Sequence, residues 1–254
     1  MMKIFKNIRS IRLDYSTPVG RRWYILLLLL VLLIYSTPMA LHRMGVYAPA
    51  MHMVQEDGPV ETAGALFCLL GSAIFLTAYF RFPIRDSSCR TTRRNHFLLL
   101  LSLFLIFLFG EEISWGQRVL NLEIYRHMAD ISFQQEFNLH NLKIVQKSNN
   151  QFATYGAKLL LIYLTFPAFA LALFPSYRRK LRLTNMPFTS LWVSFITVVN
   201  YLLLKSIKGL FDIPPFYALG IFEIFEMNLE LILLVFAVET YMICKRKTKP
   251  DGLS

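Results

Sequence analysis

Cysteine and charged residues are scarce in this 254-residue sequence, and their scarcity excludes several classes of protein. The three cysteines, Cys68, Cys89 and Cys244, have neither the paired spacing of a disulfide framework nor the close spacing of a zinc site. Only 17% of the residues are charged, whereas 55% are hydrophobic and 22 are phenylalanine, which is too apolar for an ordinary soluble domain. The composition therefore predicts a protein whose solvent is a lipid bilayer.

Familiar catalytic motifs are also missing. The sequence has no His-Glu-x-x-His, no Gly-x-Ser-x-Gly and no glycine-rich phosphate loop, which disfavours zinc proteases, serine hydrolases and nucleotide-driven enzymes. The net charge of +11 would suit nucleic acid if the basic residues formed one face of a soluble fold. They instead fall in clusters between apolar runs, so we expect no nucleic-acid partner.

Six apolar runs are long enough to cross the bilayer, which takes about 20 helical residues. They are residues 23–41, 59–80, 96–115, 156–174, 188–204 and 216–244. These runs predict an all-α fold, a polytopic helical membrane protein of about six transmembrane helices. We divide the chain into a basic segment 1–22, a membrane domain 23–244 and a basic tail 245–254.

Basic residues alternate between the connections, as the positive-inside rule requires. The segment before the first run, the second and fourth connections, and the tail together hold 19 of the 27 Lys and Arg residues. This pattern predicts cytoplasmic termini and an inner-membrane location. A cleaved secretory signal is the alternative for the first run, with the cut after the small residue Ala40. Pro38, however, occupies the position before the cut where another small residue is required, so we favour an uncleaved span.

The longest outer connection, residues 116–155, is long enough to contain its own structure. Mixed apolar and charged residues from 119 to 128 suggest a short helix lying in the membrane interface, and a second short helix fits residues 137–145.

The most unusual segment is Gly110 to Arg118, with the sequence GEEISWGQR, at the outer end of the third run. Because fifteen apolar residues would span only about 22 Å, we expect the helix to continue past Glu111 and Glu112. The two adjacent carboxylates would lie slightly below the outer surface, with Trp115 at headgroup depth. Their mutual repulsion requires compensation by a proton, a cation or Arg118.

Carboxylates also occur inside two other predicted spans. Glu61 lies one turn into the second run, and Glu223, Glu226 and Glu230 share one face of the sixth. Asn228 and Glu239 lie on the other side of that helix. Such carboxylates face a protein interior or a wet cavity, so they form either a structural polar network or a functional site for a ligand, an ion or a reaction.

In the outer connection, Glu136 and His140 are four residues apart and would share a helix face. A carboxylate and an imidazole in this arrangement can bind a metal or act together as an acid and base, although an ordinary salt bridge gives the same spacing. We therefore keep a divalent metal ion as a possible cofactor.

The candidate residues come from four segments in the outer half of the protein. The expected catalytic groups are Glu111, Glu112 and His140, and the expected metal ligands are Glu112, Glu136 and His140. The expected substrate-binding residues are Glu61, Trp115, Gln117, Arg118, Asn138, Asn141, Glu223, Glu226 and Glu230.

The run GEEISWGQR, together with Asn-Leu-His-Asn at residues 138–141, resembles uncharacterised bacterial multi-pass membrane proteins. The resemblance covers about a tenth of the chain. It implies a bacterial inner membrane and supplies no activity.

Three functions fit these features. The mixture of carboxylates with Trp, Gln, Arg and His favours an enzyme that acts on a lipid or lipid-linked substrate at the outer leaflet. A proton- or cation-coupled transporter is the second hypothesis, with Glu223, Glu226 and Glu230 as a relay. A non-catalytic membrane subunit or sensor, whose protein partner the sequence does not identify, is the third.

Overall fold

The computed structural model of the chain is all-α and describes residues 19–46, 52–53, 58–85, 92–117, 151–174, 186–210 and 215–248. Its long helices are α2 (Arg21–Arg43), α4 (Pro59–Arg81), α5 (His96–Glu112), α8 (Gln151–Leu173), α10 (Leu191–Leu210) and α11 (Pro215–Thr248). Two strands of two residues each, β1 (Ile84–Arg85) and β2 (Thr92–Arg93), pair antiparallel between α4 and α5. The all-α fold class is confirmed, and each of the six apolar runs coincides with one long helix.

Local chemistry explains where two of these helices begin. Helix α4 starts with Pro59 directly after Gly58, a position where a proline costs no hydrogen bond. Helix α5 starts after Asn95, whose side chain accepts a hydrogen bond from the amide of Phe97 at 3.2 Å.

The end of α5 differs from the sequence-based expectation. We expected one helix from His96 to Trp115, but α5 ends at Glu112 and a 3₁₀ turn, η1 (Ser114–Gly116), follows it. The reason is the backbone of Ser114 and Trp115, whose φ angles of 49° and 51° lie in the left-handed region that a right-handed helix excludes. The helix includes both glutamates but does not extend beyond them.

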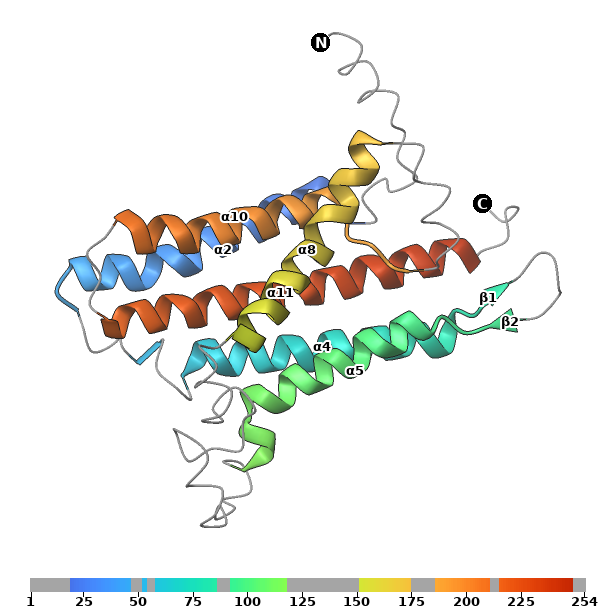
Figure 1. The fold of residues 1–254 in the computed structure, drawn as a ribbon, viewed down its shortest axis with the longest axis horizontal. Coiled ribbons are helices and arrows are strands. Elements are labelled where there is room, and N and C mark those ends of the chain that lie inside the picture. The colour runs from blue at the N-terminus through green and yellow to red at the C-terminus, as the bar shows by residue number, and fades with distance from the viewer. Residues whose placement is uncertain are drawn as a thin grey trace, which may run out of the picture.

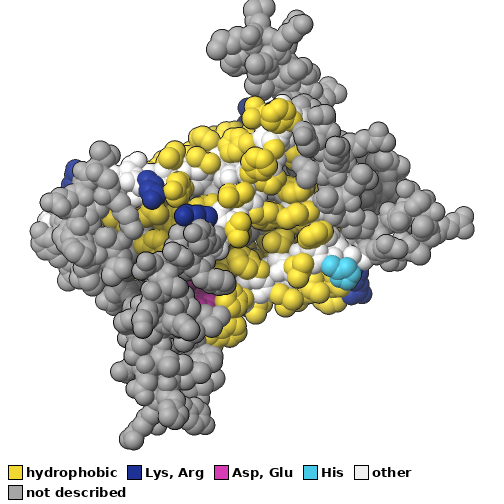
Figure 2. All heavy atoms as spheres, viewed as in Figure 1, with side chains coloured by type: hydrophobic (Ala, Val, Ile, Leu, Met, Phe, Trp, Pro, Cys, Tyr) yellow, Lys and Arg dark blue, Asp and Glu magenta, His cyan; other side chains and the backbone are white. Residues whose placement is uncertain are grey.

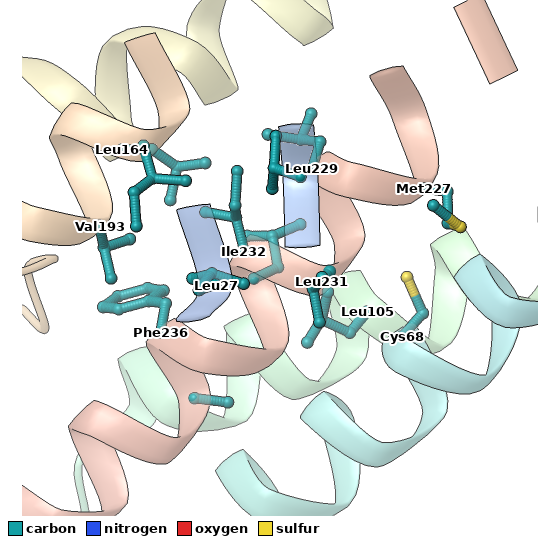
Figure 3. Close-up of a cluster of buried hydrophobic side chains, with 14 of the residues drawn as sticks. Leu27, Cys68, Leu105, Leu164, Val193, Met227, Leu229, Leu231, Ile232 and Phe236 are labelled. Atoms are coloured by element: carbon teal, nitrogen blue, oxygen red, sulfur yellow. The ribbon is translucent and has the colours of Figure 1, made fainter. Parts of the chain in front are cut away.

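Helix α11 is the central element of the bundle. It packs against α4, α10 and α2, α4 packs in turn against α5, and α8 lies against α10. Figure 1 shows α2 and α10 on one side of α11 and α4 with α5 on the other. Figure 3 shows the consequence at the side-chain level, with Ile232 and Phe236 near Leu164 and Val193 and with Met227 near Cys68.

Successive contacts establish the helix directions. Tyr24 contacts Glu239 and stacks on Trp192, whereas Tyr35 bonds Asn200 and lies beside Asn228. Helix α2 therefore runs antiparallel to α11 and parallel to α10. The ring pairs Phe75 with Phe236 and Phe82 with Tyr241 make α4 parallel to α11. Helix α5 runs antiparallel to α4, since Ser72 bonds Ser102 and the ring of Tyr79 lies 5.9 Å from that of His96.

These directions bring a group of Lys and Arg residues to one end of the bundle and a group of glutamates to the other. The end formed by the start of α2, α5 and α10 and the end of α4 and α11, here called the basic end, carries Arg21, Arg22, Arg81, Arg94, Lys245 and Arg246. The opposite end, here called the acidic end, is formed by the start of α4 and α11 and the end of α5. It carries Glu61, Glu111, Glu112 and Glu223, and Arg43 at the end of α2 and Lys205 near the end of α10 lie at the same end.

The described surface between these ends is apolar. Large hydrophobic side chains are exposed on every long helix, including Leu33, Leu100, Leu159 and Leu202, each more than half exposed. Figure 2 shows one such face, on which hydrophobic side chains dominate and few charged ones occur. An apolar surface of this extent marks contact with lipid or protein.

Two helices, α2 over Arg21–Leu41 and α4 over Pro59–Arg81, are long and apolar enough to cross a membrane by length and composition. Shorter apolar stretches occur at Lys158–Leu173 and Leu191–Ile207. The structure thus contains two candidate membrane helices, which weakly suggest membrane association.

Candidate functional site

Five carboxylates gather between α4, α5 and α11 towards the acidic end. This group, which we call the carboxylate cluster, consists of Glu61, Glu112, Glu223, Glu226 and Glu230. Glu226 lies within Coulombic range of Glu223, Glu112 and Glu61, and Glu230 lies within range of Glu112, Glu226 and Glu223. The sequence placed three of these residues on one face of α11, and the packing of α4 and α5 against that face brings in the other two.

The cluster extends from the acidic end of the bundle, where its side chains are half-buried, into the interior. Glu61, Glu112, Glu223 and Glu226 are half-buried, whereas Glu230 is only 6% exposed. From Glu223 to Glu230, seven residues of α-helix rise roughly 10 Å along the axis of α11. The carboxylates therefore lie at successive depths.

The inner two carboxylates have no compensating cation among the residues that the structure describes. Within the described ranges, neither Glu226 nor Glu230 has Lys, Arg or His as an ion-pair partner, and the charges that act on both are other glutamates. Removing a carboxylate from water is costly unless a proton, a cation or hydrogen-bond donors compensate it. The site therefore favours binding of a positive charge.

Helix α4 provides the space and the single described donor for Glu230. The thiol of Cys68 donates a hydrogen bond to Glu230 Oε1 at 3.4 Å. Gly64, one turn before Cys68, leaves room for the carboxylate, because a Cβ at this position would overlap Glu230 Oε2. Glu230 is thus held in a recess that a side chain at residue 64 would fill.

The second glutamate of the GEEISWGQR motif, Glu112, belongs to the cluster, and the first, Glu111, has a hydrogen bond within the motif itself. Glu111 is 7% exposed and accepts a hydrogen bond from Trp115 Nε1 at 2.7 Å. The left-handed turn folds the indole back onto the helix, where a Cβ on Gly110 would lie 2.9 Å from its ring. Gly116 continues the turn with a φ of 79°. Much of this motif therefore terminates α5 and fixes Trp115, which is 43% exposed.

A different arrangement surrounds Glu239 at the basic end. This carboxylate, 1% exposed, accepts hydrogen bonds from the hydroxyl of Tyr24 and from the backbone amide of Ser190 at 3.1 Å. Ser190 also caps α10, since its hydroxyl accepts a bond from the amide of Val193. Two hydrogen bonds therefore connect the Glu239 carboxylate on α11 to α2 and to the residue before α10, whereas Glu230 has one described donor, the thiol of Cys68.

A third buried polar group lies between these two, at the middle of the bundle. The hydroxyl of Tyr35 donates to Asn200 Oδ1 at 3.0 Å, and Asn200 Nδ2 donates to the carbonyl of Phe225 at 3.2 Å. The side chain of Asn228 lies beside the Tyr35 hydroxyl and is fully buried. Tyr35, Asn200 and Asn228, which we call the central polar trio, join α2, α10 and α11.

Part of the site expected from the sequence lies outside the described residues. This applies to Arg118, Glu136, Asn138, His140 and Asn141, and to the short helices expected in the outer connection. Gln117 lies half-buried after η1, close to the end of α5. In the part of the chain that the structure describes, no group of three His, Cys, Asp or Glu side chains has the geometry to hold a metal ion.

Sequence reasoning missed four residues that shape these sites, namely Gly64, Cys68, Tyr24 and Tyr35. A signal existed for the first, because Gly64 and Gly71 are seven residues apart and therefore share a face of α4. Small residues at such spacing indicate that another helix approaches closely, as α11 does here. The two tyrosines carried no signal, since their partners are distant in the sequence.

Comparisons with known proteins leave the function open. No family model, no curated protein and no solved structure matches this chain. The function must therefore be inferred from the arrangement of its residues.

Proposed function

We propose that the chain is a six-span protein of the bacterial inner membrane with both termini in the cytoplasm. The directions of α2, α4, α5, α10 and α11, the exposed apolar side chains of the long helices and the group of Lys and Arg at the basic end support this topology. In this orientation the basic end is cytoplasmic and the carboxylate cluster opens towards the outer leaflet.

Within that topology, we propose that the protein is a proton- or cation-coupled transporter. The observation that carries this proposal is the set of carboxylates from three helices at successive depths, of which Glu226 and Glu230 have no cationic partner among the described residues. Intramembrane carboxylates of this kind are expensive to maintain and mark ion or proton pathways. A proton or cation that enters from the outer end would neutralise them in turn.

The enzyme that the sequence favoured is the second candidate. Glu112 and the exposed indole of Trp115 lie at the same end of α5, where the headgroup of a lipid or lipid-linked substrate would meet them. Of the three expected catalytic groups, however, Glu111 bonds Trp115 and His140 lies outside the described residues. The transporter uses a larger part of the observed geometry.

Proton flux into proteoliposomes tests the transporter. The purified chain is reconstituted into vesicles that contain a pH-sensitive dye, and the external medium is then made more acidic than the vesicle interior. The measurement is repeated with a Na⁺ or K⁺ gradient and a dye that responds to that ion. We expect flux above that of empty vesicles for at least one cation, and a loss of about tenfold or more in Glu226→Gln/Glu230→Gln, because an amide neither releases a proton nor neutralises a cation.

Glu111→Gln is the matched control, because it makes the same chemical change at the acidic end but outside the cluster. This variant should retain most of the flux. Equal flux in the double variant and the wild type, or no flux above empty vesicles for any of the three ions, would argue against transport. In that case, altered membrane lipids in a strain lacking the protein would favour the enzyme.

A further inference from the structure

The central polar trio lies away from the carboxylate cluster, on another face of α11. Asn228 is two residues from both Glu226 and Glu230, which is about 200° around a helix. Its partners come from α2 and α10, whereas the cluster faces α4 and α5. All three members of the trio are at most 3% exposed. This is therefore a separate feature of the bundle.

Among the described residues, two members of the trio have partners in hydrogen-bond geometry and the third, Asn228, has none. Tyr35 donates to Asn200, and Asn200 donates to the carbonyl of Phe225. The Asn228 side chain lies within hydrogen-bonding reach of the Tyr35 hydroxyl. Neither its Oδ1 nor its Nδ2, however, has a partner at hydrogen-bond distance and angle within the described residues. A buried amide with both groups unsatisfied is unfavourable, and native proteins rarely keep one without a reason.

We infer that Asn228, together with the hydroxyl of Tyr35, binds a small uncharged molecule that both donates and accepts hydrogen bonds. The chemistry of the amide selects this class. A metal cation would satisfy only Oδ1, and an anion would satisfy only Nδ2, whereas water, a hydroxyl compound or an amide compound satisfies both. No charged side chain takes part in the hydrogen bonds of the trio, which also suits an uncharged ligand.

The position of the trio adds a functional meaning to this site. Asn228, Asn200 and Tyr35 lie near the middle of their helices, so they would lie near the midplane of a bilayer. Transporters bind their substrates at this depth. The ligand site nevertheless stands on the geometry of Asn228 alone and does not depend on cation flux through the carboxylate cluster.

Thermal unfolding of the purified full-length protein in detergent, with Asn228→Leu, tests the inference. Leucine has nearly the shape of asparagine, so an amide that binds nothing should be replaced at no cost or with a gain in stability. If the amide holds a ligand, we expect the unfolding temperature to fall by roughly 3–10 °C. An unchanged or higher unfolding temperature would overturn the inference.

Thr197→Val is the matched control on α10, because this hydroxyl already donates to the carbonyl of Val193 at 2.8 Å. It measures the cost of losing one satisfied local bond, and Asn228→Leu should exceed it. If Asn228→Leu does not fold, Asn228→Ser and Asn228→Ala replace it, since they differ by one hydroxyl. A serine variant more stable than the alanine variant supports the ligand, and equal or lower stability contradicts it.

Glycerol and acetamide then identify the source of the ligand. Each is added to the wild type and to Asn228→Leu over a range of concentrations, and the rise in unfolding temperature is compared. If Asn228→Leu lowers the unfolding temperature and either probe raises that temperature more in the wild type than in the variant, the site binds a hydroxyl or amide solute. Equal rises would overturn the inference, because direct contact between Asn228 and the Tyr35 hydroxyl then explains the destabilisation.

Discussion

The recess at Gly64 can be tested by filling it. Gly64→Ala places a methyl group where the Glu230 carboxylate lies, while the nearest backbone atom, Met227 Cα, would remain at 3.6 Å, an ordinary contact. The helices can therefore stay together, but the carboxylate must move and lose its bond to Cys68. Overpacking of this kind costs about 1–3 kcal/mol, and the better helix propensity of alanine returns about 1 kcal/mol.

A double-mutant cycle separates these contributions. When Glu230→Ala has removed the carboxylate, Gly64→Ala has no clash and should stabilise the protein by about 1 kcal/mol through helix propensity. The coupling free energy between the two residues should therefore be about 1–3 kcal/mol, measured as equilibrium unfolding in mixed micelles.

Gly71→Ala is the control for this cycle. An added Cβ at Gly71 would lie 2.8 Å from Leu105 Cδ1, so its cost arises from a different neighbour and should be the same with and without Glu230. If Gly64→Ala costs the same free energy in both backgrounds, the recess does not hold the carboxylate and our description of it is wrong.

Two further substitutions test the described hydrogen bonds. Tyr24→Phe removes the hydroxyl that donates to the buried Glu239 carboxylate, and it should lower the free energy of unfolding by about 1–3 kcal/mol; stability equal to the wild type would contradict the bond. Trp115→Phe keeps an aromatic ring near Gly110 but removes the donor to Glu111, and it should cost about 1–2 kcal/mol. Chemical denaturation checks both variants, and a cost of Trp115→Phe that is the same with and without Glu111→Ala would contradict the bond between the two residues.

The helices and their order could be predicted from the sequence because bilayer-length apolar runs depend only on local composition. The α11 face that carries Glu223, Glu226 and Glu230 followed from helical periodicity alone. Association of these residues with Glu61 and Glu112 was a hypothesis from shared depth, and the packing of α4 and α5 against α11 gives it structural support.

The remaining features depend on contacts between residues that are far apart in the chain. Tyr24 and Glu239 are separated by 215 positions, and no periodicity relates them. The end of α5 could not be predicted for another reason. The preference of Trp115 for headgroup depth suggested that the helix reached it, whereas its bond to Glu111 and its packing on Gly110 favour a tight left-handed turn.

The most direct test of the proposed cation pathway compares the stability of variants at Glu226 and Glu230, which have no described cationic partner, with that of a variant at Glu239, which has two hydrogen-bond donors. The thermal unfolding temperatures of Glu226→Gln/Glu230→Gln and of Glu239→Gln are measured side by side in detergent at neutral pH, in a buffer without Na⁺, K⁺ or divalent cations, so that no bound metal ion stabilises the wild type. Glutamine removes mutual repulsion in the cluster, so we expect the double variant to unfold at the same or a higher temperature than the wild type. At Glu239, glutamine places a donor NH₂ where two donors already converge, and we expect a lower unfolding temperature. A double variant as destabilised as Glu239→Gln would mean that Glu226 and Glu230 hold the bundle together through partners, and it would contradict a cluster that binds a proton or cation.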